Sequence, residues 1–236
     1  MKVDAATVPR DPADTGRETL LVSKAGGLTQ FGAYSVTLPP SAKASDRHWH
    51  SVEDEFLLVL DGTATVIDDH GAHQLGAGDV AAWRKGDPNG HHVLNKSAAP
   101  VRYLIIGSRV VEDICTYPDS GRRQVNGKTH WQVLDASGEV LRGGTLPPEL
   151  LNLSADWGIP FDPALAVQRV LPASARQWVQ DGALTHPVLG TGPGPYRYSV
   201  LGDPGGLSQF GIHLEAVPPA ARRRSVIGTK LRTRWS

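Results

Sequence analysis

One six-residue segment occurs twice in this 236-residue chain, and it limits the available folds more than any other feature. Residues 27–32 read GLTQFG and residues 206–211 read GLSQFG, and a Pro-Pro pair follows each copy at the same interval. Over residues 27–42, eight of sixteen positions are identical to those 179 residues later, without a gap. Because self-similarity at a fixed offset indicates a repeated structural unit, we expect the chain to begin the same domain twice.

The first half of the chain consists of short segments with strand character. They are rich in β-branched or aliphatic residues and end at turn sequences such as Pro39-Pro40 and Asp61-Gly62. We expect strands at residues 34–38, 56–60, 63–67, 79–83, 92–94 and 101–106. Since no helical segment separates them, the pattern favours an all-β fold, a small antiparallel barrel or sandwich, over a parallel α/β sheet.

The pattern changes beyond residue 120. A hairpin is expected over residues 130–141 and a short helix near 145–153, where two prolines favour a first helical turn. A second short helix is expected over 173–181, stopping at Gly182. We therefore predict the following organisation: a complete domain over 15–120, a linker with the hairpin and short helix over 121–160, an incomplete second repeat over 161–221, and a tail over 222–236.

Residues 48–55, with the sequence HWHSVEDE, contain the first part of a candidate metal site. His48 and His50 are two positions apart, so on an extended strand both imidazoles project from one face. Glu55 has the opposite parity, so a turn or bulge must redirect it, and Glu53 or Asp54 are the alternatives. This segment therefore offers two imidazoles and one carboxylate to a shared ion.

A second histidine cluster supplies the rest of the site. His91 and His92 begin a predicted strand after the turn at residues 86–90, and Asn95 follows them. Three neutral imidazoles and a carboxylate, with coordination positions left open, suit a divalent transition metal such as Mn, Fe, Ni, Cu or Zn. The sequence thus predicts a metal centre built from two separate β-segments.

These residues resemble the two motifs of the cupins, a superfamily of jelly-roll β-barrels. The first cupin motif contains a His-x-His pair, a glutamate four residues further on and a glycine after six more, and residues 48–62 match it. The glycine that usually precedes the pair is missing. In the second motif the matches are Gly78, His91 and Asn95, whereas Arg84-Lys85-Gly86 replaces its Pro-x-Gly segment and the loop before His91 is longer.

The resemblance covers about residues 20–112 and implies a cupin-type jelly-roll barrel, followed by a partial second cupin repeat with a few short helices. By its spacing to Asn95, His91 rather than His92 takes the place of the second-motif histidine, although His92 stays possible. The implied metal ligands are His48, His50, Glu55 and His91.

Two classes of function are compatible with this resemblance, which is to bacterial two-domain cupins of unassigned activity. The first is a metal-dependent enzyme acting on a small molecule, as an isomerase, dioxygenase or lyase. The second is a non-catalytic module that binds or senses a small ligand, or a metal-free cupin with a structural role. The sequence identifies no catalytic acid or base. The charges of Arg84, Lys85 and Asp87 are expected to be solvated, with contact to an anionic substrate as the alternative.

Composition restricts the setting of the protein. The single cysteine, Cys115, excludes an internal disulfide, and no stretch approaches the roughly 18 consecutive apolar residues of a membrane helix. We therefore expect a cytoplasmic protein without a membrane partner. Because cupin barrels often pair through their sheets, we also expect a homodimer.

The tail over residues 222–236 carries six basic residues and no acidic one. Such a tail is typical of nucleic-acid or membrane binding, but its codons allow another interpretation. In a shifted reading frame, each new codon consists of the last base of one codon and the first two bases of the next. With permitted synonymous codons, residues 226–234 read in this frame can give His-Trp-His-Glu-Ala-Glu-Asp-Glu. The two histidines then fall 179 residues after His48 and His50.

We therefore interpret the tail as out-of-frame sequence that cuts a second cupin domain short, and we expect no nucleic-acid partner. The nucleotide sequence of the gene tests this interpretation. If it is correct, the opening strands of the incomplete barrel have unpaired edges and apolar faces, and they should pack on the first barrel or on a second subunit.

Overall fold

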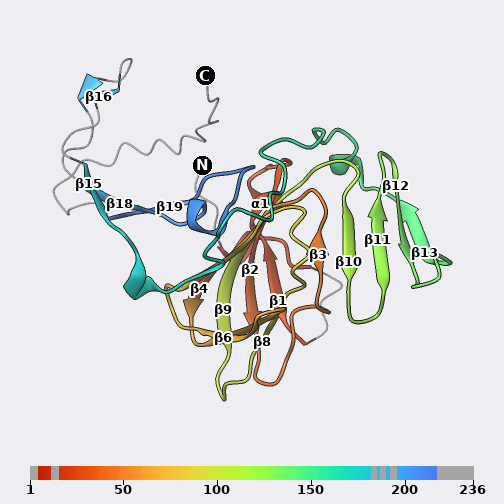
Figure 1. Cartoon of the computed structure of the whole chain (residues 1–236), viewed down its shortest axis with the longest axis horizontal. Coiled ribbons are helices and arrows are strands. Elements are labelled where there is room, and N and C mark those ends of the chain that lie inside the picture. Colours follow the sequence, from red (N-terminus) through yellow and green to blue (C-terminus); the bar gives the residue numbers. More distant parts are fainter. Residues whose placement is uncertain (1–4, 12–15, 182–184, 187–189, 192–195, 217–236) are drawn as a thin grey trace.

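The computed structural model describes residues 5–11, 16–181, 185–186, 190–191 and 196–216. Antiparallel strands dominate it. A central barrel lies between a four-stranded antiparallel region on one side and the strands of the second repeat on the other (Figure 1). The helical segments are short: η1 (Ala5–Thr7), α1 (Val22–Ala25), η2 (Pro148–Leu150), η3 (Ala173–Ala175) and η4 (Asp203–Gly205). The predicted all-β fold is confirmed.

Two antiparallel sheets form the barrel. The larger has the strand order β1-β2-β9-β4-β7-β14 and the smaller the order β6-β5-β8. The strands of the larger sheet are β1 (Glu18–Leu21), β2 (Phe31–Leu38), β4 (Glu55–Asp61), β7 (Val80–Trp83), β9 (Val101–Ser108) and β14 (Val170–Leu171). The smaller sheet contains β5 (Ala64–Asp68), β6 (Gly71–Leu75) and β8 (His92–Leu94). All six strands predicted for this half are present; β1 and β6 were not predicted.

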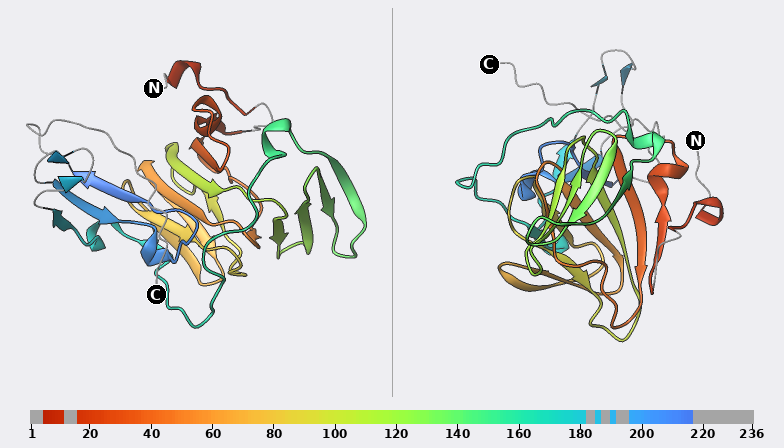
Figure 2. Two further views of the ribbon diagram at one scale, coloured as in Figure 1. Left: turned by 90° about the horizontal axis from the view of Figure 1, so that it is seen from above. Right: turned by 90° about the vertical axis from the view of Figure 1, so that its right-hand side faces the viewer.

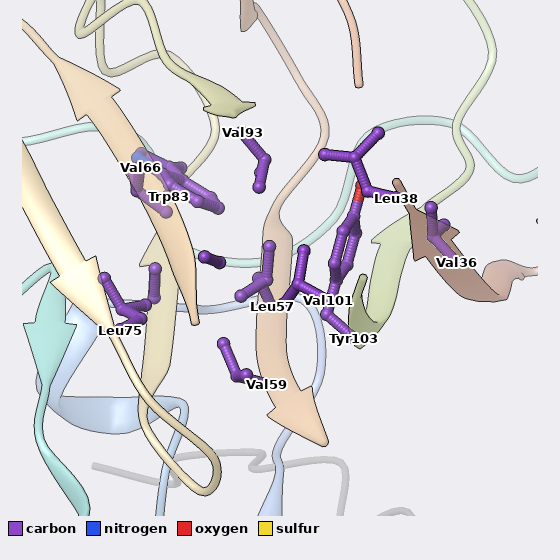
Figure 3. Packing of buried hydrophobic residues seen from close by; sticks show 12 residues of the cluster. Val36, Leu38, Leu57, Val59, Val66, Leu75, Trp83, Val93, Val101 and Tyr103 are labelled. Carbon is purple, nitrogen blue, oxygen red and sulfur yellow. The ribbon is translucent and has the colours of Figure 1, made fainter. Parts of the chain in front are cut away.

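Alternate residues of β4 and β7 pack on opposite faces of the larger sheet, as the period of two along a strand requires. Leu57 of β4 and Trp83 of β7 point into the barrel, where they join the main core (Figure 3). Phe56 and Val80 point outward into a second apolar cluster. Burial on both faces explains why these strands read as nearly continuous apolar runs.

The second apolar cluster joins the second repeat to the barrel. Leu201, Leu207 and Leu171 are buried against the outer face of β4 and β7, and Phe210 and Ile212 pack beside them. β14 also pairs with β7 at the edge of the larger sheet. Residues 201–212 and β14 therefore pack on the first barrel, so this part of the second repeat takes one of the two arrangements expected from the sequence.

Residues 114–145 extend a sheet away from the barrel (Figure 2). Its order is β13-β12-β11-β10-β3, so it continues directly into the strand that carries His50. The strands are β3 (Trp49–His50), β10 (Ile114–Tyr117), β11 (Arg122–Asn126), β12 (His130–Leu134) and β13 (Val140–Thr145). The predicted hairpin and short helix are present as β12, β13 and η2, but the sequence did not reveal β10 and β11.

The second repeat contributes a three-stranded sheet of order β15-β18-β19 and a small hairpin. Its strands are β15 (Val179–Asp181), β16 (Thr185–His186), β17 (Gly190–Thr191), β18 (Tyr196–Val200) and β19 (His213–Ala216). The predicted helix over 173–181 is wrong. Only the turn of η3 forms there, because residues 179–181 pair with β18 and that pairing overrides local helical preference. The predicted tail over 222–236 lies outside the described residues.

The two repeats agree bond for bond at the offset of 179. Leu21 pairs with Tyr34 between β1 and β2, and Val200 pairs with His213 between β18 and β19. The turns that follow agree as well. In the first repeat the N–H groups of Gly26 and Leu28 both donate to the carbonyl of Ser23, and that of Gly27 donates to Lys24. In the second repeat the N–H groups of Gly205 and Leu207 both donate to the carbonyl of Gly202, and that of Gly206 donates to Asp203. Sequence repetition is therefore matched by repetition of backbone structure.

Among the described residues, the structure contains no helix with the length and apolar character needed to cross a lipid bilayer.

Candidate metal centre

Backbone pairing brings the two histidine clusters together at one end of the barrel. The N–H of His48 donates to the carbonyl of His91 at 3.0 Å, and the N–H of His91 donates to the carbonyl of His48 at 2.9 Å. Glu55 is the first residue of β4, where it pairs with Trp83 and Gly107 on its two sides. Three predicted ligands therefore start from backbone positions fixed by strand pairing.

The side chains of His48, Glu55 and His91 converge. One ligand atom from each lies within 4.8 Å of the others. Nε2 of His91 lies 2.7 Å from Oε2 of Glu55, and Nε2 of His48 lies 4.0 Å from the same oxygen. Since metal–nitrogen and metal–oxygen bonds are about 2.0–2.2 Å long, donors of one ion lie up to about 4.4 Å apart. Small side-chain rotations would suffice for these three groups to share an ion.

His50 lies beside this trio. It forms one cluster with His48 and Cys115 and another with Glu53 and Asp113. Its ring centroid is 5.2 Å from that of His48. The structure thus gathers three of the four predicted ligands around one point and places the fourth next to His48.

All three histidines are held through Nδ1. That nitrogen contacts the carbonyl of Asp46 at 2.9 Å in His48, a carboxylate oxygen of Asp113 at 2.7 Å in His50, and the carbonyl of Asn89 at 3.3 Å in His91. Carbonyls and carboxylates only accept, so Nδ1 carries a proton in His48 and His50. In His91 the nitrogen that donates to Glu55 is Nε2, at 2.7 Å, and a metal ion bound there would take the place of that proton. Anchoring of one nitrogen on such a partner is the usual arrangement for histidines that bind metal through the other.

The electrostatics of the trio favour the protonation states that a metal ion requires. Burial lowers the pKa of His48 to about 4, so its imidazole is neutral near pH 7. Burial would raise the pKa of Glu55, but the hydrogen bond from His91 and the neighbouring imidazoles lower it to about 2. A neutral imidazole and an ionised carboxylate are the ligand forms of these side chains.

His50 has a different electrostatic environment. Burial opposes its charged form, but the carboxylate of Asp113 more than compensates and raises the pKa of His50 well above the usual value. A metal ion bound there must displace a proton, so binding through His50 is coupled to proton release.

The alternative ligands considered from the sequence have other roles in the structure. Glu53 accepts from the N–H of Val110 at 3.0 Å and lies 3.8 Å from His50, and burial raises its pKa to about 7. Asp54 faces the second repeat, where its carboxylate accepts from the N–H groups of Lys85, Ser208 and Gln209.

His92 is turned away from the trio. It borders a cavity of about 350 Å³ that is also lined by Lys43, Arg47, Tyr117 and Arg122. Its Nδ1 contacts the carbonyl of Ser45 at 3.3 Å. The spacing to Asn95, which favoured His91 as the ligand, agrees with this geometry.

A second cavity adjoins the centre through Glu53. Its volume is about 400 Å³, and Glu53, Arg109, Trp131 and Arg142 are among the residues that line it. Arg109 donates to the hydroxyl of Tyr34 at 2.8 Å. The cavity therefore combines a carboxylate next to His50 with two guanidinium groups.

Two residues near the centre were not identified from the sequence. Asp113 and Cys115 stand two positions apart at the start of β10, which pairs with β3 so that Cys115 lies opposite His50. The signal was the alternation Asp113-x-Cys115-x-Tyr117, which places three polar side chains on one face of a strand. It became meaningful only once the pairing with β3 was known.

The charged loop of the second motif is buried, contrary to the expectation that it is solvated. Lys85 donates to Asp156 and to the carbonyl of Trp157, and Arg84 donates to the carbonyl of Pro160. Asp87 forms an ion pair with Arg169 at 2.6 Å. These side chains hold residues 156–169 against the barrel instead of facing a substrate.

Comparison with known proteins agrees with the fold. The family model for the cupin domain matches residues 34–107. The crystal structure of a sugar phosphate isomerase of the cupin superfamily from Silicibacter pomeroyi is 32% identical in sequence, covers 69% of this chain and 98% of its own, and superposes with a TM-score of 0.51.

A second crystal structure, a proposed sugar phosphate isomerase from Acidithiobacillus ferrooxidans, also has a TM-score of 0.51. It is 23% identical and covers 58% of this chain and 90% of its own, so it supports the fold alone. A search of curated proteins gave no match.

Proposed function

The chain belongs to the cupin superfamily, and on this basis we propose that it is a metal-dependent isomerase acting on a small phosphorylated sugar. The proposal has two parts: a divalent transition metal held by His48, His50, Glu55 and His91, and turnover of a sugar phosphate beside it. They rest on different observations and are tested separately.

The proposed metal site rests on one observation, the convergence of the side chains of His48, Glu55 and His91. Their donor atoms lie within 4.8 Å of one another, and Nε2 of both His48 and His91 faces the same Glu55 oxygen. The donor set of imidazoles and one carboxylate fits a first-row divalent ion. His50 would complete the set by a rotation that keeps its Nδ1 on Asp113.

The similarity to the Silicibacter pomeroyi isomerase, over nearly the whole of that protein, supports the substrate class. The cavity beside Glu53 supports it too, because the guanidinium groups of Arg109 and Arg142 border it. Guanidinium groups bind phosphate oxygens through paired, charge-assisted hydrogen bonds. A phosphate held there would direct the sugar carbons toward the metal-binding end of the barrel.

Isomerisation of a sugar requires transfer of a proton between neighbouring carbon atoms. A bound divalent ion supplies a Lewis acid that polarises the adjacent oxygen atoms. Glu53 is the residue of this chain suited to carry the proton, since its carboxylate lines the cavity and lies 3.8 Å from Nδ1 of His50. Trp131 borders the same cavity and would exclude water from one side of it.

Elemental analysis of the purified protein tests the metal part. We expect about one divalent ion per chain in the wild type, and loss of that ion in His91→Ala and Glu55→Gln. His73→Ala is the matched control, because His73 pairs with Asp68 and belongs to none of the ligand clusters found among the described residues. Equal metal content in all four proteins would refute the proposed ligand set.

Incubation with aldose and ketose phosphates in deuterated water tests the catalytic part. We expect deuterium incorporation at the carbon next to the carbonyl, and its loss in Glu53→Gln with metal content retained. A protein that keeps its metal and binds sugar phosphates without exchange would instead be the non-catalytic binding module considered from the sequence. The homodimer and the cytoplasmic location stay predictions.

A further inference from the structure

Phe31 and Phe210 occupy equivalent positions in the two repeats, and they contact each other. Their ring centroids are 5.5 Å apart and their planes are inclined at 82°. In an isologous interface, equivalent residues of the two copies contact each other beside the two-fold axis. The contact between Phe31 and Phe210 is therefore the one expected where the two repeats meet as the halves of such an interface.

One half of this interface is formed. Residues 206–210 occupy a site on the first barrel, called here the Asp54 seat, which consists of Val52, Asp54 and Ser108. The Asp54 carboxylate accepts from the N–H groups of Ser208 at 2.6 Å and Gln209 at 2.8 Å. The Gln209 amide accepts from the N–H of Asp54 at 2.8 Å and donates to the carbonyl of Val52 at 2.8 Å.

The other half has the same structure but is exposed. Residues 27–30 make the same turn as residues 206–209, and Gly27 and Gly206 both have left-handed backbone angles, with φ of 70° and 79°. Leu28 is 54% exposed, whereas its equivalent Leu207 is 8% exposed. Gln30 is likewise exposed and its equivalent Gln209 is buried. The segments thus differ in burial and not in local conformation.

We propose that residues 27–31 form a docking strip for a second cupin barrel, seated as residues 206–210 are seated on the first. The local two-fold axis specifies the contacts. A carboxylate equivalent to Asp54 would accept from the N–H groups of Thr29 and Gln30, and Leu28 would enter an apolar site like that of Leu207.

A test needs a barrel whose Asp54 seat is empty. A variant of this chain in which residues 206–210 no longer bind to the seat provides such a barrel. The double variant Leu207→Asp/Gln209→Ala removes the apolar and amide contacts that hold residues 206–210. Two such molecules can then place each strip in the seat of the other, around a true two-fold axis. By sedimentation velocity we expect this variant to form an assembly with twice the mass of the wild-type species, whatever the oligomeric state of the wild type, with a dissociation constant on the order of micromolar.

Strip variants identify the surface. Adding Leu28→Asp or Gln30→Ala to the double variant should weaken this dimer at least ~tenfold, since each removes a buried contact. Adding Leu141→Asp should leave it unchanged, because Leu141 is exposed on β13, on the opposite side of the barrel from the second repeat (Figure 1). A folded double variant that stays in the wild-type state, or a dimer insensitive to Leu28→Asp, would overturn the proposal.

A single substitution tests the same idea if the double variant fails to fold. Ser208→Thr converts residues 206–211 into GLTQFG, the sequence of the strip. If the strip fits an Asp54 seat, the free energy of unfolding of this variant should match that of the wild type within about 0.5 kcal/mol. A marked loss of stability would show that the strip sequence does not fit and would also overturn the proposal. Neither experiment depends on the metal.

Discussion

The carboxylate of Asp113 accepts a hydrogen bond from Nδ1 of His50 at 2.7 Å, and it also accepts from the Ser51 hydroxyl and the Val52 N–H, each at 3.1 Å. This carboxylate is fully buried. It therefore fixes both the ring of His50 and the backbone that leads from β3 to β4. A residue outside the predicted motifs thus orients a predicted ligand.

We expect Asp113→Asn to lower metal affinity by about 10–100-fold, because loss of a carboxylate partner frees the imidazole to rotate and reduces its basicity. Competition with a chelator measures the affinity. Asp119→Asn is the control, since Asp119 is an exposed partner of Arg47, and it should bind metal as the wild type does. Equal affinities in both variants would mean that His50 is not a ligand.

His48 should contribute stability to the metal-free protein that is lost as the pH falls from about 6.5 to about 4. The pKa of His48 is lowered to about 4 by burial, whereas in the unfolded chain it is near 6.5, so between these values the unfolded state binds more protons at this residue. Glu53, whose pKa burial raises to about 7, acts in the opposite direction, so the His48 contribution is measured by difference. Urea denaturation across this range should show that His48→Gln loses less stability on acidification than the wild type. Equal changes in the two proteins would contradict the buried, neutral state of His48.

Gln209→Ala should cost about 1–3 kcal/mol of unfolding free energy, because it leaves the carbonyl of Val52 without its amide donor and removes one of the two acceptors of the buried Asp54 N–H, the other being the Ser108 hydroxyl. Gln30→Ala removes the equivalent side chain at an exposed position and should change stability by less than about 0.5 kcal/mol. Chemical denaturation of the pair provides the comparison. Similar losses in both would argue against different environments for the two segments.

A matched glycine pair tests how closely the second repeat packs on the barrel. A Cβ added to Gly205 would lie 2.4 Å from the Cβ of Ala82, whereas one added to the equivalent Gly26 would meet nothing closer than 3.6 Å. We expect Gly205→Ala to cost about 1–3 kcal/mol by overpacking and Gly26→Ala to cost less than about 0.5 kcal/mol. Thermal unfolding monitored by circular dichroism measures both. If Gly205→Ala is as stable as the wild type, the contact between residue 205 and Ala82 is looser than the structure indicates.

Patterns with a short period made most of the barrel predictable. The strands over 56–60 and 79–83 were apparent because both faces of β4 and β7 are apolar, one facing the core and the other facing the second repeat. The resemblance placed His48 and His91 in one predicted site, and their backbone pairing was found only in the structure. The repeat at an offset of 179 correctly indicated equivalent structure at residues 27–32 and 206–211.

The sequence was less informative where long-range contacts decide the outcome. Residues 179–181 pair with β18 although the surrounding alanines and glutamine favoured a helix. Arg84 and Lys85 looked like solvated loop charges, yet residues 156–160, more than seventy positions later, bury them. Asp54 was considered as a ligand, but its partners lie about 155 residues away. In each case the partner is distant in sequence, and no pattern in the sequence links it to the residue that it contacts.

Trp83 lies parallel to His91, with ring centroids 3.8 Å apart and an interplanar angle of 7°. An indole stacked on an imidazole is sensitive to any change in the charge or bonding of that imidazole. Occupation of the centre by a paramagnetic ion should therefore quench the fluorescence of this one tryptophan. The fold thus provides an intrinsic optical sensor of its own metal centre, readable without label or substrate.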